Sequence, residues 1–535
     1  MSKQILFSED ARKKLASGIS QAAHAARVTL GPKGRNVILA KGFGGPRITN
    51  DGVSIVKEIS LKDPFENVGA DLVKDVANKT NDGAGDGTTT SIVLYDSMVS
   101  AGMKALGEGK NAMAIRRGME RAADDIVAAL KKIAKPINGK ADIELVASVS
   151  SESKDLGKTI AETIERVGND GVVTVEESQG TETTFDVVDG MQTEKGYISP
   201  YMVTDEEKME AEYKDVFVLV TDKQIMNPQD LVPVLEKVAQ TGSRELVIVA
   251  DDVGGEALPT LVVNKMRGNF SSLAIKTPGF GDFKAEQIRD LAIMLGATVV
   301  SDETGIELKD VTTEHLGKCA RVVSSKDKTI FVGGSGKKAA VQERIKQIHA
   351  DLAKSDSRFD IERLEKRIAK LGGGIAVIKV GAHTETAMKY LKDKIEDAVK
   401  ATKASIEDGI IPGGGVALTK IAHELKANTE DVDEASGYSI VMSAMSAPFK
   451  QILANAGKEN IQEITAWVLE KPKHGYNAAS DEMVKDIVAD GIIDPVKVTR
   501  NAVLNSTSAA AIFLTTEAAV VELPEPKPQA GTMDF

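Results

Sequence analysis

The stretch that decides the fold is NDGAGDGTTTSIVLY, residues 81–95, where two glycine-flanked aspartates lead through three threonines into an apolar segment. Threonine and aspartate are common helix caps, so a structural cap is the simplest explanation. A cap explains one threonine and leaves the group Asp86, Gly87, Thr88, Thr89 and Thr90 unexplained. A helix N-terminus attracts phosphate, glycine admits an anion close to the backbone, and a carboxylate beside polyphosphate most often holds Mg²⁺. The stretch therefore favours phosphate binding over a cap alone.

Size and composition place limits on the rest of the chain. A length of 535 residues predicts two to four domains, and 42% hydrophobic with 27% charged residues is typical of a soluble globular protein. No apolar run approaches the roughly 20 residues of a membrane span. The N-terminus MSKQILFSEDARKKL lacks an apolar signal segment, and the single Cys319 fits a reducing compartment. We expect a cytoplasmic protein without a membrane partner.

Several functional classes are disfavoured by composition. A net charge of -12 and an aromatic content of 4% argue against nucleic acid as a partner. The six histidines are scattered and form no HExxH motif, which argues against a zinc site made by the protein alone. No GxSxG motif for acyl chemistry is present.

The two ends of the chain have a helical pattern. Apolar spacing predicts helices over 9–29, 68–79, 91–106, 112–133, 384–408, 414–425, 435–456 and 461–469. Short strands are predicted at RNVILA (35–40) and VSIVKEI (53–59), and a strand pair around YNAASDEM (476–483) and IVADGIIDP (487–495). The proline-rich tail, 523–535, is predicted to be disordered.

The middle of the chain has a different pattern. VFVLV (216–220), ELVIVA (245–250), SSLAIKT (271–277) and ATVVS (297–301) are continuous apolar runs between helical segments. Such runs predict a parallel sheet covered on both faces, within an α/β domain of about 190–374. The glycines at its borders, Gly190 and 372–374, are either plain turns or hinges.

Further glycine-rich or acidic fragments suit the other half of a phosphate site. They are TLGPKGRNV (29–37), TNDGVS (49–54), PGGGVAL (412–418), and the loops that carry Asn477 and Asp494. Each is weak alone. GGSGKKAA (333–340) resembles a Walker loop but lacks the first glycine and the final Ser/Thr, so we interpret it as a turn. Because the fragments lie only near the two ends, we predict one domain built from both ends, with the middle inserted.

Together these motifs resemble a group I chaperonin. The resemblance also includes PGFGD (278–282), AKLGGGIAVIKVG (369–381), GYNAAS (475–480) and GIIDPVKVTR (491–500), and it extends from Ile5 to about Leu523. It implies a mostly α-helical equatorial domain, residues 1–135 and 408–535, for ATP and ring contacts. It also implies a small α+β intermediate hinge domain, 136–189 and 375–407, and an inserted α/β apical domain, 190–374.

The implied activity is ATP-driven protein folding. The resemblance implies two stacked heptameric rings, non-native polypeptides as substrates and a heptameric, GroES-like co-chaperonin as a lid. It implies ATP and Mg²⁺ as cofactors, with K⁺ as a further candidate ion.

The resemblance also implies roles for individual residues. Asp86 would ligate Mg²⁺, Asp397 would be the catalytic acid on a moving domain, and Asp51 a second acid near the attacking water. The nucleotide contacts would come from Thr29, Leu30, Gly31, Pro32, Asn50, Asp86, Gly87, Thr88, Thr89, Thr90, Gly414, Asn477, Ala478, Ala479 and Asp494. Without the resemblance, Asp397 is most simply a solvated helix acid.

A substrate-binding surface is indicated by EALPTLVVNKMRG, residues 256–268. Three consecutive apolar residues on a helix span roughly 200°, more than one sheet face covers, so part of this helix should be exposed. A fully buried helix is the alternative. The resemblance implies substrate contacts at Tyr197, Tyr201, Val232, Leu235, Leu258, Val262 and Val263.

Two departures from the family pattern stand out. Asn50 occupies the position of a family lysine, so no ammonium reaches the phosphate from there, and the tail lacks Gly-Gly-Met repeats. Two alternative functions remain: a ring-forming holdase without productive cycling, and a small-molecule kinase.

Overall fold

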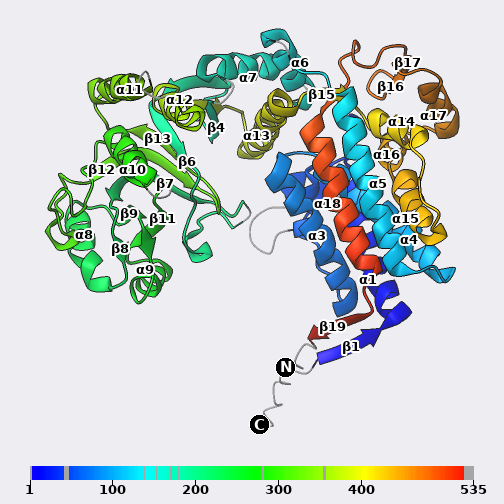
Figure 1. Cartoon of the computed structure of the whole chain (residues 1–535), viewed down its shortest axis with the longest axis horizontal. Coiled ribbons are helices and arrows are strands. Elements are labelled where there is room, and N and C mark those ends of the chain that lie inside the picture. The colour runs from blue at the N-terminus through cyan, green and yellow to red at the C-terminus, as the bar shows by residue number, and fades with distance from the viewer. Residues whose placement is uncertain are drawn as a thin grey trace, which may run out of the picture. The chain divides into compact units, whose positions relative to one another are not determined.

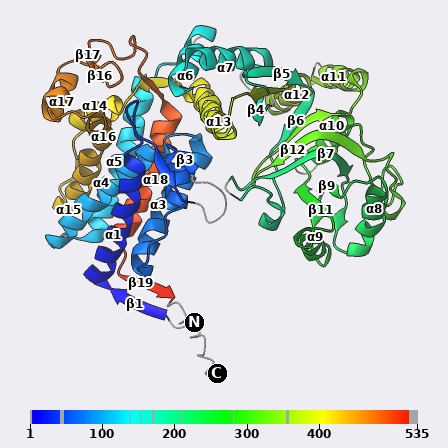
Figure 2. The same ribbon diagram turned by 180° about the vertical axis from the view of Figure 1, so that it is seen from behind.

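The computed structural model describes residues 3–522, apart from 41–46, 138, 152, 169–170, 179, 207, 280–281 and 353–356. It divides into two compact units, Met1–Ala161 with Lys389–Phe535, and Glu162–Met388 (Figures 1 and 2). The first unit is helical and is formed by both chain ends, and the second contains the main sheet. The predicted multidomain class is confirmed. The tail predicted to be disordered, 523–535, lies outside the described residues.

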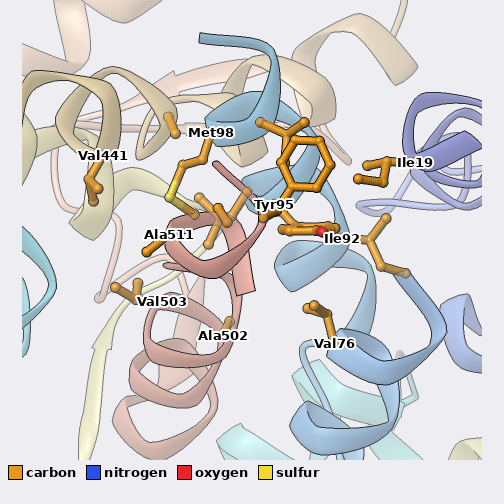
Figure 3. Close-up of a cluster of buried hydrophobic side chains, with 14 of the residues drawn as sticks. Ile19, Val76, Ile92, Tyr95, Met98, Val441, Ala502, Val503 and Ala511 are labelled. Carbon is orange, nitrogen blue, oxygen red and sulfur yellow. The ribbon is translucent and has the colours of Figure 1, made fainter. Parts of the chain in front are cut away.

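Five long helices build the first unit. They are α1 (Ser8–Arg27), α3 (Pro64–Ala84), α4 (Thr88–Gly107), α5 (Ala112–Ile133) and α18 (Val496–Leu514), and α18 packs against α3, α4 and α5. Figure 3 shows Met98 of α4 beside Ala511 of α18, with Tyr95 of α4 and Val503 of α18 in the same cluster. All four side chains are buried. Burial of this apolar area is what holds the last helix of the chain against the first ones.

Short elements complete this unit. The helices are α2 (Gly52–Lys57), α6 (Lys140–Ser151), α14 (Val416–Glu424), α15 (Val432–Ala444), α16 (Ala447–Asn455) and α17 (Ile461–Glu470). The antiparallel strand pairs are β1 (Lys3–Phe7) with β19 (Ala518–Glu522), β2 (Val37–Leu39) with β3 (Arg47–Thr49), β15 (Ile410–Pro412) with β18 (Ile493–Pro495), and β16 (Gly475–Asn477) with β17 (Glu482–Val484). Two helices, α7 (Lys154–Val167) and α13 (Glu385–Asp408), have residues in both units.

The second unit contains a six-stranded sheet in the order β11-β9-β7-β12-β13-β6. The strands are β6 (Gly190–Thr193), β7 (Ala211–Val220), β9 (Glu245–Ala250), β11 (Ser271–Lys276), β12 (Gly317–Ser324) and β13 (Thr329–Gly334). Its helices are α8 (Pro228–Gln240), α9 (Ala257–Met266), α10 (Asp282–Leu295), α11 (Lys338–Leu352) and α12 (Arg358–Gly372). Short elements are β8 (Gln224–Ile225), β10 (Asp252–Val253) and the 3-10 turns η1 (Pro200–Met202) and η2 (Leu308–Asp310).

A separate three-stranded sheet in this unit has the order β4-β14-β5, from β4 (Val172–Glu177), β5 (Thr184–Val188) and β14 (Ile375–Val380). It falls within the segments predicted to form an intermediate domain, 136–189 and 375–407, which are divided between the two units. The three-domain boundaries remain a prediction.

Five expectations about elements were wrong. The segments 476–483 and 487–495 do not pair with each other, because β16 pairs with β17 and β18 pairs with β15. VSIVKEI forms α2 instead of a strand, because Asp51 caps the helix by accepting the backbone N–H groups of Val53 and Ser54. ATVVS forms only an isolated bridge between Val300 and Thr221. The main sheet is mixed, since β7, β9 and β11 are parallel and the other pairings are antiparallel.

The fifth concerns 435–456, which was predicted as one helix and forms two. Helix α15 ends at Ala444 and α16 begins at Ala447, with Pro448 in its first turn. Proline lacks the N–H that would continue the preceding helix, and it is well tolerated at a helix start. Within the described residues, no helix combines the length and the apolar character needed to span a membrane.

Candidate functional site

The first part of the site is the start of α4. Its N-cap, Gly87, has a left-handed backbone with φ of 81° and makes no side-chain capping bond. The first N–H groups of a helix lack intrahelical partners, so those of Thr88, Thr89 and Thr90 are of the kind that can bind an anion. The glycine-threonine motif therefore lies where the sequence predicted it, at a helix N-terminus without a side-chain cap.

The second part of the site, the segment 49–54 (called the second loop below), lies directly against this end of α4. A Cβ atom on Gly52 would be 2.4 Å from Thr89 Oγ1, so only glycine permits the two segments to approach this closely. Asp51 directly precedes Gly52. Its carboxylate accepts hydrogen bonds from the N–H groups of Val53 at 3.3 Å and Ser54 at 2.8 Å. Asp51 is thus a helix cap that also lies beside the phosphate motif. Asn50, predicted as a nucleotide contact, is exposed.

Helix α13 brings Asp397 and Lys400 to the segment between α3 and α4. Gly85, which ends α3 with φ of 72°, has no room for a Cβ atom because the atom would lie 2.3 Å from Lys400 Cδ. Lys400 and Asp397 are three residues apart on α13 and so share one face of the helix. Asp86 and Asp51 both repel the Asp397 carboxylate and help to raise its pKa, in keeping with the approach of Lys400 to Gly85.

The C-terminal part of the chain supplies Asp494 and the triple glycine. Strand β15 pairs with β18 so that Ile411 lies opposite Asp494, which places the following glycines beside that carboxylate. The Asp494 carboxylate accepts the N–H groups of Gly414 and Gly415, both of which have positive φ. Gly415 is the N-cap of α14 and, like Gly87, it makes no side-chain capping bond.

Helix α16 connects three parts of the site. The Nδ2 group of Asn455 donates to the carbonyl oxygens of Arg27 and Leu30, both at 2.9 Å, and fixes the loop after α1. That loop contains Thr29, Leu30, Gly31 and Pro32, and a Cβ atom on Gly31 would lie 3.0 Å from Ile452 of α16.

The same helix contacts the other two segments. A Cβ atom on Gly415 would lie 2.8 Å from the backbone nitrogen of Phe449. Phe449 also belongs to a buried apolar cluster with Val416 of α14 and Ala478 of the 477–479 loop. Three of the segments for which the resemblance implies nucleotide contacts thus meet at α16.

The loop with Asn477, Ala478 and Ala479 is built by its own hydrogen bonds. Asn477 Oδ1 accepts the N–H groups of Ala479 at 3.0 Å and Ser480 at 3.1 Å, and its Nδ2 donates to Asp490 at 2.7 Å. The Lys420 ammonium donates to the carbonyl oxygens of Lys471, Pro472 and His474 just before the loop, at 3.1, 2.7 and 2.6 Å. Since Lys420 is on α14, it ties the helix that starts at the triple glycine to this loop.

The site has an excess of negative charge. Burial raises the pKa of Asp86, and repulsion from Asp51 adds to the shift. Burial also raises the pKa of Asp397 well above its ordinary value, and it raises the pKa of Asp494 to about 7. Repulsion from Asp86 adds to both shifts. Carboxylates in this state favour a bound cation.

The donor set fits a magnesium ion that is shared with phosphate. Within the described ranges, no group of three His, Cys, Asp or Glu side chains is arranged to hold a metal ion. Mg²⁺ in phosphate sites is usually held by one or two carboxylates and completed by phosphate oxygens and water. Asp86, between two anion-binding helix ends, suits that arrangement.

The predicted substrate surface lies in the second unit. On α9, Leu261 is buried while Val263 is 42% exposed, so the prediction of partial exposure is confirmed. Helix α8 contacts α9 and presents Val232, which is 43% exposed, and Tyr201 on η1 is 72% exposed. Leu235, Leu258 and Val262 are partly buried.

Tyr197, also predicted as a substrate contact, contributes little to the exposed part of this surface. Its side chain is 8% exposed and lies in the core of the second unit, and its backbone bridges to Ile275. By contrast, Met266 at the end of α9 is 76% exposed and was not predicted.

Sequence reasoning also missed Lys400, Lys420 and Asn455. The only signal for Lys400 was its position one helical turn after Asp397. Lys420 and Asn455 act through backbone carbonyl groups, and no motif encodes such contacts.

With this geometry described, comparison with known proteins identifies the class. Residues 23–524 match the sequence profile of the TCP-1/cpn60 chaperonin family, and the chain belongs to that family. Among solved structures it is similar to the chaperonin gp146 from the bacteriophage EL 2 (Pseudomonas aeruginosa), crystallised in the presence of ATP-BeFx. The TM-score is 0.68 at 22% identity, covering 97% of this chain and 99% of the phage chain. This likeness supports the fold.

Proposed function

We propose that this protein is an ATP-hydrolysing group I chaperonin, similar to bacterial GroEL, that encloses non-native polypeptides and promotes their folding. The observation that carries the proposal is the convergence of Asp86, Asp397 and Asp494 with two glycine-capped helix ends in one unit. ATP in complex with Mg²⁺ is the ligand that matches two anion-binding ends and a cluster of acids. The phage chaperonin, crystallised with ATP-BeFx, is consistent with this.

The nucleotide would be bound by residues from both chain ends. The N–H groups of Thr88, Thr89 and Thr90 would bind phosphate oxygens, and Asp86 would hold Mg²⁺, which neutralises phosphate charge when bound. The loop with Gly31 and the residues around Asp494 and Asn477 would hold the rest of the nucleotide.

Asp397 would act on the attacking water. A carboxyl group with a raised pKa, placed among phosphate-binding groups, can orient that water and accept its proton. Asp51 is bound to two backbone N–H groups, so its remaining lone pairs would only help to position the water.

An Asp397→Ala variant tests the proposal. We expect it to bind ATP and to lose most of its steady-state turnover, about 100-fold or more, because the general base is removed. Glu396→Ala, an acid on the same helix, is the matched control and should retain turnover. Unchanged ATPase in Asp397→Ala would overturn the role. Since a holdase without cycling needs no hydrolysis, the same assay separates the two functions.

Substrate binding is proposed for the apolar surface of Tyr201, Val232, Val263 and Met266, all of them exposed. Non-native chains, and a heptameric GroES-like lid, would compete for it because apolar contacts are not sequence-specific. Val263→Glu should abolish capture of an unfolded test protein and leave basal ATPase intact. Capture that persists would place the substrate site elsewhere.

Assembly into two stacked heptameric rings belongs to the same proposal. K⁺ is proposed only as a further ion, by analogy with the family, and the three-domain division with its hinged intermediate part is proposed on the same ground.

A further inference from the structure

We propose that Lys400 is a further catalytic residue of the nucleotide site, and that its ammonium group contacts the terminal phosphate of bound ATP. This inference rests on the proposed ATPase function and adds a cation to a site whose predicted residues are mostly acids, glycines and threonines. Asn50, on the second loop, supplies none.

Packing places the aliphatic stem of Lys400 next to the phosphate motif. Its Cβ, Cγ and Cδ atoms would lie 2.5, 2.8 and 2.3 Å from a Cβ atom built on Gly85, so the aliphatic chain crosses directly over that glycine. Gly85 precedes Asp86, and Gly87 caps α4. The ammonium is two bonds beyond Cδ, so it is within reach of the segment that leads from Gly85 into α4, where we propose that phosphate binds.

Gly85 shows that this close contact is built into the site. Its left-handed backbone, with φ of 72°, is favourable for glycine, and any side chain would overlap Lys400. A side chain at Gly85 would displace the Lys400 stem.

The charges around Lys400 support the same role. Among the basic groups of the described chain, Lys400 is the one that acts electrostatically on both Asp86 and Asp397 and favours their ionised forms. Phosphoryl transfer requires charge on the equatorial oxygens to be neutralised, and a lysine beside the metal ligand supplies this. Lys400 is exposed, so its ammonium can move by the short distance that a phosphate contact requires.

The first experiment compares Lys400→Gln, Lys400→Arg and Lys389→Gln in the full-length protein. Lys389 lies on the same helix, about 16 Å along its axis, and is the matched control for loss of charge. We expect kcat for ATP to fall on the order of 100-fold in Lys400→Gln, with a smaller change in ADP affinity. Lys400→Arg should retain most of the activity.

The second experiment uses the unaltered protein and so does not depend on how the variants fold. Lysines are acetylated with an amine-reactive ester, and mass spectrometry compares labelling without nucleotide, with Mg-ADP and with Mg-ADP plus beryllium fluoride. We expect Lys400 to be protected at least 5-fold by the beryllium fluoride complex and much less by Mg-ADP, while Lys389 labels equally in all three.

Equal kcat in Lys400→Gln and Lys389→Gln, or no difference in Lys400 labelling among the nucleotide states, would overturn the inference. Absence of ATP hydrolysis in the unaltered protein would instead refute the proposed function, so the two failures are distinct.

Discussion

Gly415 illustrates how single residues shape the site. It has φ of 77°, and a Cβ atom would lie 2.8 Å from the backbone nitrogen of Phe449. Gly415→Ala should lower the free energy of unfolding by about 1 to 3 kcal/mol, because a residue with a side chain is strained there. Nucleotide affinity should fall as well, since the start of α14 would shift.

Thermal unfolding measures the stability effect, and Gly107→Ala is its control. Gly107 lies within α4, with no atom within 4 Å of an added Cβ. Alanine there should have no effect or stabilise the helix slightly. Equal effects of the two substitutions would contradict the interpretation of Gly415.

Asp494 shows a conflict between stability and function. Burial raises its pKa to about 7, so above pH 7 the folded protein holds an ionised carboxylate in a buried place, which lowers its stability. Below about pH 4 the carboxyl group is protonated in both the folded and the unfolded state, and this loss of stability is absent. Asp494→Asn should therefore raise stability at pH 8 by about 1 to 4 kcal/mol and much less at pH 5, without nucleotide. It should also weaken ATP binding. Unfolding curves at the two pH values check this, and an equal gain at both would contradict it.

At the residue scale, sequence alone predicted that the glycine-threonine motif lies at a helix start, and its phosphate binding stays a prediction. Asp86 and the three threonines form a pattern that ordinary caps do not need, and they start a helix as predicted. Asp397 depended on the family resemblance, because a single acid on a polar helix has no signature of its own. Tyr197 was placed on the substrate surface and is buried, since burial depends on contacts that are distant in sequence.

At the scale of elements, α16 matters because it contacts three of the segments that we propose to bind the nucleotide. Asn455 holds the loop after α1 through two carbonyl groups. Asn455→Ala would leave these carbonyls without that donor, and we expect ATP affinity to fall about 5- to 20-fold, in line with 1 to 2 kcal/mol, with kcat little changed. Isothermal titration with Mg-ATP measures the affinity.

Asn460→Ala is the control for that variant, because Asn460 is an exposed amide that bonds only to a nearby glutamate, Glu463, among the contacts described. If both variants bind ATP equally well, α16 does not position the loop.

Elements with clear helical periodicity were predicted correctly, such as 112–133, whose boundaries match α5. The strand predicted for VSIVKEI was wrong. Its β-branched residues favour a strand in isolation, but the cap at Asp51 and the burial of Val53, Ile55 and Val56 favour a helix. The parallel part of the main sheet was predicted, and the antiparallel strands β12, β13 and β6 were not, because their pairing is decided by contacts remote in sequence.

At the scale of the whole molecule, two small sheets are suited to ring assembly. The pair β1–β19 exposes Ile5, Phe7 and Val520, and the pair β2–β3 exposes Ile38 and Ile48. Two-stranded sheets with open edges and apolar residues tend to add strands from another chain. We expect the β1–β19 sheet of one subunit to pair with the β2–β3 sheet of the next.

Phe7→Asp should therefore shift the protein from rings to single subunits, which sedimentation velocity measures directly. Val187→Asp, at an exposed apolar residue of the second unit, should leave the rings intact. Rings that persist in Phe7→Asp at the same concentration would exclude this sheet as the contact.

The most direct test of the account is a cryo-electron microscopy structure with Mg²⁺, ADP and beryllium fluoride. We predict that the nucleotide lies against the start of α4, with the metal at Asp86 and with Gly414 and Asp494 on its other side. Density for the nucleotide at any other place, or none at saturating concentration, would contradict the claim that both chain ends build one ATP site.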